Sequence, residues 1–292
     1  MIRLDAATVL LQWAAGGLAF CWFTTRRREV GLGYGWLLRS TYLVMALGAV
    51  AAGAAVGFDP VRDAASVGVA VAAAAALVVS VQRRRAGVSG QQAAYDRREA
   101  RVAAMTGIER TGRVDDEPID DAGSEFPPAL DLLAPAVGLI GLVAAGVDAS
   151  GGSAGDTVVS VLRVVVGAAF LGALSDAMLL GHWYLVQPGL PRRLLNELVR
   201  VVGLILPLEI AVLLLPTGML SAITGRVDDG WNGTLAWFWV ASAVATGVLT
   251  VVTRAALRER SYSAVMAATG LLYLAILTGF GTDLVARAVL AG

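Results

Sequence analysis

Eight apolar segments, each long enough to cross a lipid bilayer, constrain the fold of this 292-residue chain more than any other feature. A transmembrane helix needs about 20 apolar residues to cross about 30 Å of hydrocarbon. The segments cover residues 5–23, 36–57, 64–81, 129–147, 157–186, 198–220, 235–253 and 262–286. Charged residues make up 16% of the chain, against about 25% in soluble domains. The sequence therefore predicts an all-α, polytopic transmembrane bundle of about eight helices.

The arginines predict how this bundle is oriented. All 23 basic residues are arginine, and 18 of them lie in or beside the loops after the first, third, fifth and seventh segments. Basic residues gather on the cytoplasmic side of membrane proteins, so we expect both termini outside. Residues 26–28 are three arginines that follow the first apolar segment. A cleaved signal peptide carries its positive charge before the apolar core, so this segment is interpreted as an uncleaved anchor.

A polar stretch divides the chain into three parts. Residues 1–82 form a three-helix membrane part, residues 83–128 a cytoplasmic linker, and residues 129–292 a five-helix membrane part. Within the linker, residues 91–105 predict a polar helix. Residues 106–128 are rich in acidic side chains and poor in apolar ones, a composition typical of disorder.

Two acids in apolar segments are the candidate ion site. Asp176 and Glu209 lie in consecutive segments joined by a short loop, at similar predicted depths. A charge inside the bilayer is costly and marks a functional site by default, so we expect the two carboxyls to share a mid-membrane proton or cation site. The alternative is that each acid pairs with Arg39, with Arg200 or with a Ser or Thr hydroxyl and only fixes packing. Arg39 and Arg163 are the candidate partners for buried charges.

His182 and an arginine cluster follow Asp176 toward the inner surface. His182 is the only histidine, which excludes bis-histidine haem ligation within one chain. Its candidate roles are a polar anchor at the inner membrane surface, a point of proton entry toward Asp176, a contact for quinone, or an axial ligand of haem. Arg192, Arg193 and Arg200 lie at the inner headgroup level, where arginines attract anionic lipids.

Three functional classes remain open. The favoured one is a transporter, or another membrane protein coupled to protons or cations. The second is an accessory subunit of a larger membrane complex, respiratory and linked to quinone or haem. The third is an interfacial enzyme acting on an isoprenoid or phospholipid headgroup. On balance, the small set of candidate site residues favours a protein that is not an enzyme.

Composition limits the partners and the location. A net charge of zero gives no indication of a nucleic-acid partner. The expected partners are the bilayer, anionic lipids at its inner face, and either further copies of this chain or other membrane subunits. Abundant Ala, Val and Gly with arginine in place of lysine is typical of a bacterial cytoplasmic-membrane protein. The sequence identifies neither cofactor nor metal, and the single Cys21 excludes an intrachain disulfide.

Overall fold

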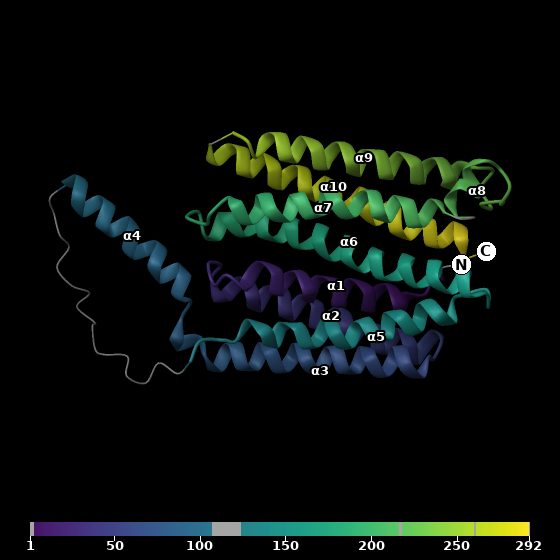
Figure 1. Ribbon diagram of the computed structural model, residues 1–292, viewed down its shortest axis with the longest axis horizontal. Helices are drawn as coiled ribbons and strands as arrows, with labels where there is room; N and C mark the ends of the chain where they lie inside the picture. Colours follow the sequence, from purple (N-terminus) through teal and green to yellow (C-terminus); the bar gives the residue numbers. More distant parts are fainter. Residues whose placement is uncertain (1–2, 107–123, 216–217, 260, 292) are drawn as a thin grey trace.

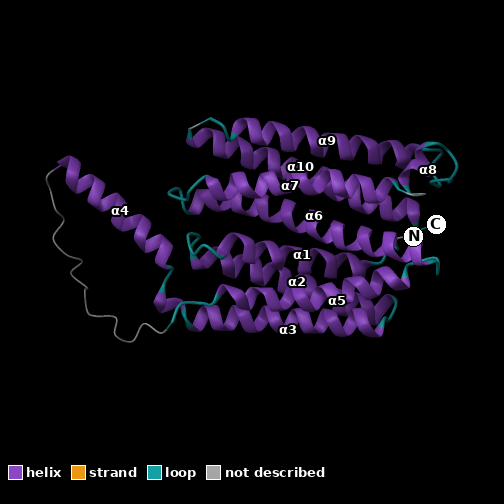
Figure 2. Cartoon of the chain, in the orientation of Figure 1, coloured by secondary structure: helices purple, strands orange, loops and turns teal. Residues whose placement is uncertain are grey.

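Every regular element that the structure describes is a helix (Figures 1 and 2). The computed structural model describes residues 3–106, 124–215, 218–259 and 261–291. Its long helices are α1 (Ala6–Thr25), α2 (Leu32–Val56), α3 (Pro60–Gln82), α4 (Ser89–Thr106), α5 (Leu133–Asp148), α6 (Ala154–Val186), α7 (Arg193–Leu214), α9 (Thr234–Ala256) and α10 (Tyr262–Leu290). The short ones are η1 (Arg84–Ala86), η2 (Pro128–Leu132) and α8 (Met219–Ile223).

Seven of the described helices are long and apolar enough to cross a membrane: α1, α2, α3, α5 with the preceding η2, α6, α9 and α10. The predicted polytopic helical bundle is thereby confirmed. The remaining expected segment, residues 198–220, corresponds largely to α7, which packs against α6 and α9. α7 is not among the seven because Arg193, Glu197, Arg200 and Glu209 interrupt its apolar run.

Short polar side chains set where several helices begin. Asp5 caps α1 by accepting hydrogen bonds from the backbone N–H groups of Ala7 and Thr8, and Asp59 caps α3 in the same way. Ser153 and Ser261 cap α6 and α10. The first N–H groups of a helix have no partner inside it, so a side-chain acceptor at this position stabilises the helix start.

The bundle consists of two groups of four helices (Figure 1). Helices α1, α2, α3 and α5 form one group, and α6, α7, α9 and α10 form the other. Helix α1 lies at the centre, since it contacts α2, α5 and α6. Because α5 packs against α3 and α1, the helix after the linker joins the group that precedes the linker. The predicted polar helix corresponds to α4, and residues 107–123 of the predicted disordered stretch lie outside the described residues.

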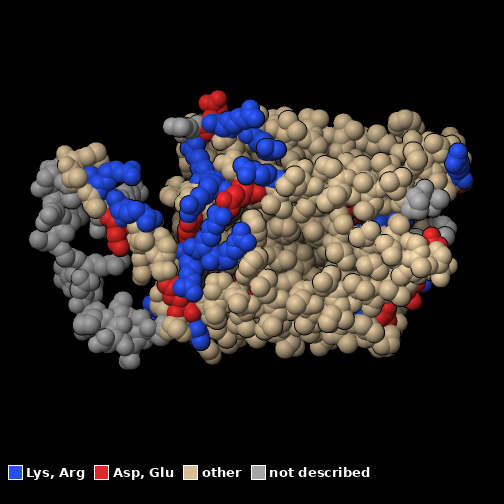
Figure 3. Space-filling view, in the orientation of Figure 1, with Lys and Arg blue, Asp and Glu red and all other residues tan. Residues whose placement is uncertain are grey.

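The two ends of the bundle differ in charge and in what they carry. Both chain termini lie at one end, and α4 projects from the opposite end (Figure 1). Arginines cover the end that carries α4 (Figure 3). We call this the inner end, following the rule that basic residues face the cytoplasm, and call the end with the termini the outer end.

Small residues bring α1 and α6 into close contact near the middle of both helices. A Cβ atom on Gly172 would lie 2.3 Å from the backbone carbon of Gly16, and one on Gly16 would lie 1.9 Å from the carbonyl oxygen of Ala168. A Cβ on Gly17 would lie 2.0 Å from the Tyr42 ring. Only glycine fits at these positions. Such small faces let transmembrane helices approach closely, and here they hold the backbones of α1 and α6 in direct contact.

Candidate functional site

Asp176 lies on α6 in the inner half of the bundle and is completely buried. The hydroxyl group of Tyr42, on α2, donates a hydrogen bond to its Oδ1 atom. Its Oδ2 atom has no hydrogen-bond partner in the part of the chain that the structure describes. Asp176 therefore meets the hydroxyl of a tyrosine, and not Arg39, Arg200 or a Ser or Thr hydroxyl, the partners of the alternative interpretation.

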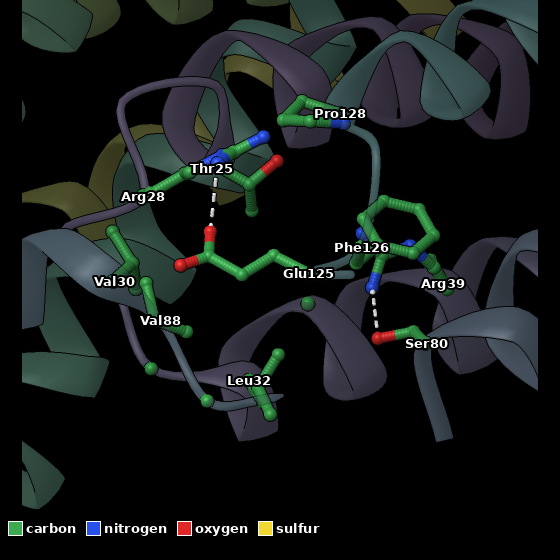
Figure 4. A pocket seen from close by; sticks show the side chains of 13 residues that line it. Thr25, Arg28, Val30, Leu32, Arg39, Ser80, Val88, Glu125, Phe126 and Pro128 are labelled. Atoms are coloured by element: carbon green, nitrogen blue, oxygen red, sulfur yellow. Dashed lines mark hydrogen bonds and ion pairs between the residues drawn. The ribbon is translucent and has the colours of Figure 1, made fainter. Parts of the chain in front are cut away.

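Arg39 forms its ion pair with a residue that the sequence analysis missed. Its Nε and Nη2 atoms each lie 2.7 Å from the carboxylate of Asp131, and both side chains are almost fully buried. Its guanidinium also donates to Ser80 and lies 4.2 Å from the Phe126 ring centroid (Figure 4). Asp131 belongs to η2, at the boundary between linker and membrane segment, and for that reason its burial was not evident from the sequence.

Glu209, on α7, is the second predicted acid and is also completely buried. Neither of its carboxyl oxygens has a hydrogen-bond partner among the described residues. The charged side chains of Asp283 and Arg287 on α10 lie in its electrostatic surroundings. An ionised carboxylate without paired oxygens is very costly to bury, so Glu209 is an exceptional group in this bundle.

Asp283 and Arg287 form a buried polar cluster with Gln12 of α1. The Arg287 Nε atom lies 2.8 Å from Asp283 Oδ2, and the Arg287 guanidinium also donates to the Gln12 side-chain oxygen. Gln12 Nε2 lies 3.4 Å from Asp283 Oδ1. All three side chains are completely buried. We call these three residues with Glu209 the outer cluster.

Helix α6 completes the outer cluster with a glycine. A Cβ atom on Gly167 would lie 2.1 Å from Gln12 Nε2 and 2.9 Å from Asp283 Oδ1. The sequence did contain one signal for this cluster: Asp283 and Arg287 are four residues apart in an apolar segment, the spacing of an intrahelical ion pair. Gln12 gave no such signal.

The structure does not bring Asp176 and Glu209 together. Asp176 lies 10 residues from the inner end of α6, and Glu209 lies 16 residues from the inner end of α7. At about 1.5 Å per residue these depths differ by about 9 Å. The expectation of a shared site assumed that α7 starts near residue 198, whereas it starts at Arg193. The two acids therefore belong to separate clusters on either side of the α1–α6 contact.

Arg163 has a structural partner at the outer end. Its Nε atom lies 2.8 Å from the carbonyl oxygen of Val212, and its Nη2 atom lies 2.9 Å from that of Leu215. These carbonyls belong to the last turn of α7, which leaves such groups without partners inside the helix. A cation at a helix C-terminus is also favoured by the helix dipole. Arg163 therefore fastens α6 to the end of α7.

His182 lies toward the inner end of α6, beside α10. Its Nδ1 atom lies 3.1 Å from the hydroxyl oxygen of Tyr273, and the two rings meet edge to face. The structure thus gives His182 a neighbour on α10, at a level nearer the inner end than Asp176. Among the described residues, no group of three or more His, Cys, Asp or Glu side chains could hold a metal ion.

The three arginines of the predicted headgroup site have different surroundings. Arg193 pairs with Glu29, and Arg192 donates to the carbonyl oxygen of Glu259 at 2.8 Å. Arg200 is exposed on α7. These contacts tie α7 to neighbouring loops at the inner end, and lipid binding there stays a prediction.

Comparisons of this chain with known protein families, with curated proteins and with solved structures found no match.

Proposed function

We propose that this membrane protein is a transporter coupled to protons or another small cation, with Glu209 as the ion-binding carboxylate. The observation that carries the proposal is the complete burial of Glu209 with both carboxyl oxygens free of hydrogen bonds. A purely structural acid at this depth would be paired, because an unsatisfied buried polar group is destabilising. Intramembrane acids that face the bundle interior mark ion and proton pathways.

The charges around Glu209 fit a site that gains and loses one positive charge. Asp283 and Arg287 neutralise each other at 2.8 Å, so a protonated Glu209 leaves the outer cluster with no net charge. Loss of the proton leaves one negative charge beside Asp283, which a cation or a new proton would compensate. The site can therefore alternate between a state with one bound ion and a state without it.

Asp176 supports the proposal from the inner half of the bundle. Its Oδ1 atom accepts from Tyr42, and its Oδ2 atom is free. In the proposed mechanism Asp176 exchanges the ion with the inner side, and Glu209 exchanges it with the outer side. The close contact of Gly16 with Gly172 separates the two acids, so transfer between them requires α1 and α6 to move apart.

The test compares Glu209→Gln with Glu197→Gln on the same helix. Glu197 is partly exposed at the inner end and pairs with Arg27 at 2.8 Å. Each purified variant is reconstituted in liposomes that contain a pH-sensitive dye, and a potassium diffusion potential drives proton uptake. We expect Glu197→Gln to keep the wild-type flux and Glu209→Gln to reduce it at least tenfold.

Infrared spectroscopy gives a second readout that needs no substrate. A protonated carboxylic acid has its own carbonyl stretching band, and we expect one titrating component of this band to be present in the wild type and lost in Glu209→Gln. Equal flux and an unchanged carboxylic-acid band in both variants would refute the proposal.

A further inference from the structure

A pocket at the outer end lies directly above the outer cluster. Its cavity volume is about 420 Å³, and it is bordered by the ends of α1, α5 and α10, by Val164 within α6 and by the turn between α2 and α3. We call it the outer vestibule. Its charged lining residues are Arg3, Asp5, Asp59, Arg62, Asp148 and Arg287.

The rim of the outer vestibule is built from ion pairs. Arg3 pairs with Asp148 at the end of α5, and Arg62 pairs with Asp5 at the start of α1. Two arginines and two aspartates therefore face this space in pairs, and Asp59, which caps α3, adds a third carboxylate. Such a polar lining is suited to water.

The floor of the outer vestibule meets the outer cluster at Arg287 and lies about one helical turn from its other residues on three helices. Thr8 on α1 and Arg287 on α10 line the pocket, four residues before Gln12 and four residues after Asp283. On α6 the lining residue Val164 precedes Gly167 by three residues. Residues three or four apart are neighbours on one helix face.

Arg287 joins the outer vestibule to the outer cluster. Its Nη1 atom lies 3.3 Å from the carbonyl oxygen of Arg3 at the rim, and its Nε atom lies 2.8 Å from Asp283 in the cluster. The side chain is completely buried. Any path from the outer vestibule to Glu209 along this face passes the Arg287 guanidinium.

We propose that the outer vestibule is the route by which protons reach Glu209 from the outer side, with Arg287 as its gate; this rests on the proposed function. The closed floor favours protons over the other cations that the proposed function leaves open. A metal cation would have to shed its water to pass the buried Arg287 side chain, whose charge Asp283 neutralises. A proton can pass through hydrogen-bonded water and side chains without a cavity of ionic size.

The experiment places one thiol on the floor of the outer vestibule. Cys21 is buried and is the only cysteine of the chain, so Cys21→Ala provides a background without thiols. Thr8→Cys puts the thiol on the floor. Val158→Cys, on the outer part of α6, is the control, because Val158 is 58% exposed and lies outside the pocket lining.

Each variant is treated in detergent with a trimethylammonium methanethiosulfonate, and labelling is measured by intact mass. The labelled and unlabelled forms are then reconstituted, and proton flux is compared. We expect labelled Thr8→Cys to lose flux at least fivefold relative to its unlabelled form, and labelled Val158→Cys to keep its flux.

Three outcomes would overturn the inference. If Thr8→Cys does not react while Val158→Cys does, the outer vestibule does not admit water to its floor. If labelled Thr8→Cys keeps full flux in vesicles where Glu209→Gln abolishes it, protons reach Glu209 by another route and the proposed function stands. If Glu209→Gln itself keeps full flux, the proposed function fails, and the inference fails with it.

Discussion

Tyr42 on α2 donates its hydroxyl hydrogen bond to Asp176 on α6, and both side chains are completely buried. The two residues belong to different helix groups of the bundle. The Tyr42 ring covers Gly17 of α1, which leaves room for it only because glycine has no Cβ. Helices α1, α2 and α6 together therefore place the Tyr42 hydroxyl group against the Asp176 carboxyl oxygen.

Tyr42→Phe should destabilise the protein. The change leaves Asp176 without a hydrogen bond, since its other carboxyl oxygen has no partner. Leaving a buried acceptor unsatisfied costs about 1–3 kcal/mol. Thermal unfolding in detergent, followed by tryptophan fluorescence, measures this loss.

Tyr34→Phe is the matched control for that measurement. Tyr34 lies on the same helix and is completely buried, but its hydroxyl, which lies near Thr24, forms no hydrogen bond of standard geometry with the described residues. Removing a hydroxyl that is already unsatisfied should leave stability unchanged or raise it. Equal losses in the two variants would contradict a specific role for the Tyr42 hydroxyl.

Gly172→Ala should separate α1 from α6. The added Cβ would lie 2.3 Å from the backbone of Gly16, which cannot rotate away as a side chain could. Overpacking of this kind costs about 1–3 kcal/mol. Gly270→Ala on α10 is the control, because nothing lies within 4 Å of its added Cβ. We expect a lower melting temperature for Gly172→Ala and no loss for Gly270→Ala; the reverse order would show that the helices do not meet at Gly172.

Asp131→Asn should be among the most destabilising single changes at the inner end. It leaves the buried guanidinium of Arg39 without its charged partner, and breaking a buried pair in this way costs about 3–5 kcal/mol. Glu197→Gln breaks the partly exposed pair with Arg27, for which about 0–1 kcal/mol is expected. Chemical unfolding in mixed micelles compares the two. A small effect of Asp131→Asn would mean that water reaches Arg39.

The apolar segments predicted the helices because crossing a bilayer restricts both length and composition. The same reasoning found Asp176 and Glu209, and both are completely buried. It missed their neighbours. Which face of a helix meets which partner depends on helix rotation and packing, so neither the contact of Tyr42 with Asp176 nor that of Gln12 with Arg287 could be inferred from spacing.

The start of α7 explains why a shared acidic site was expected. Its first turns contain Arg193, Glu197 and Arg200, and charged residues of this kind are typical of a loop at the membrane surface. The structure continues the helix through them because Leu194, Leu195 and the residues that follow on the same face are buried. This extension moves Glu209 toward the outer end, away from Asp176.

Asp229 at the outer end organises the start of α9. Its Oδ1 atom accepts hydrogen bonds from the backbone nitrogens of Trp231 at 2.9 Å and Gly233 at 2.8 Å, and its Oδ2 atom accepts from Ala236 at 3.1 Å. Burial acts to raise the pKa of Asp229, but these backbone donors outweigh it and hold the pKa below its ordinary value. The charged form is therefore the one that stabilises the fold.

Asp229→Asn should lower the melting temperature at neutral pH, and the difference from wild type should shrink in acid. A carboxylate with a lowered pKa contributes stability above its unfolded pKa of about 3.9, and that contribution disappears as the pH falls through the folded pKa. Asp228→Asn is the control, because Asp228 accepts only from the backbone nitrogen of its near neighbour Gly230 and is exposed. The melting temperatures of Asp229→Asn and wild type should therefore differ at about pH 7 and approach each other at about pH 3. A difference that stays constant between these pH values would show that the charge of Asp229 does not stabilise α9.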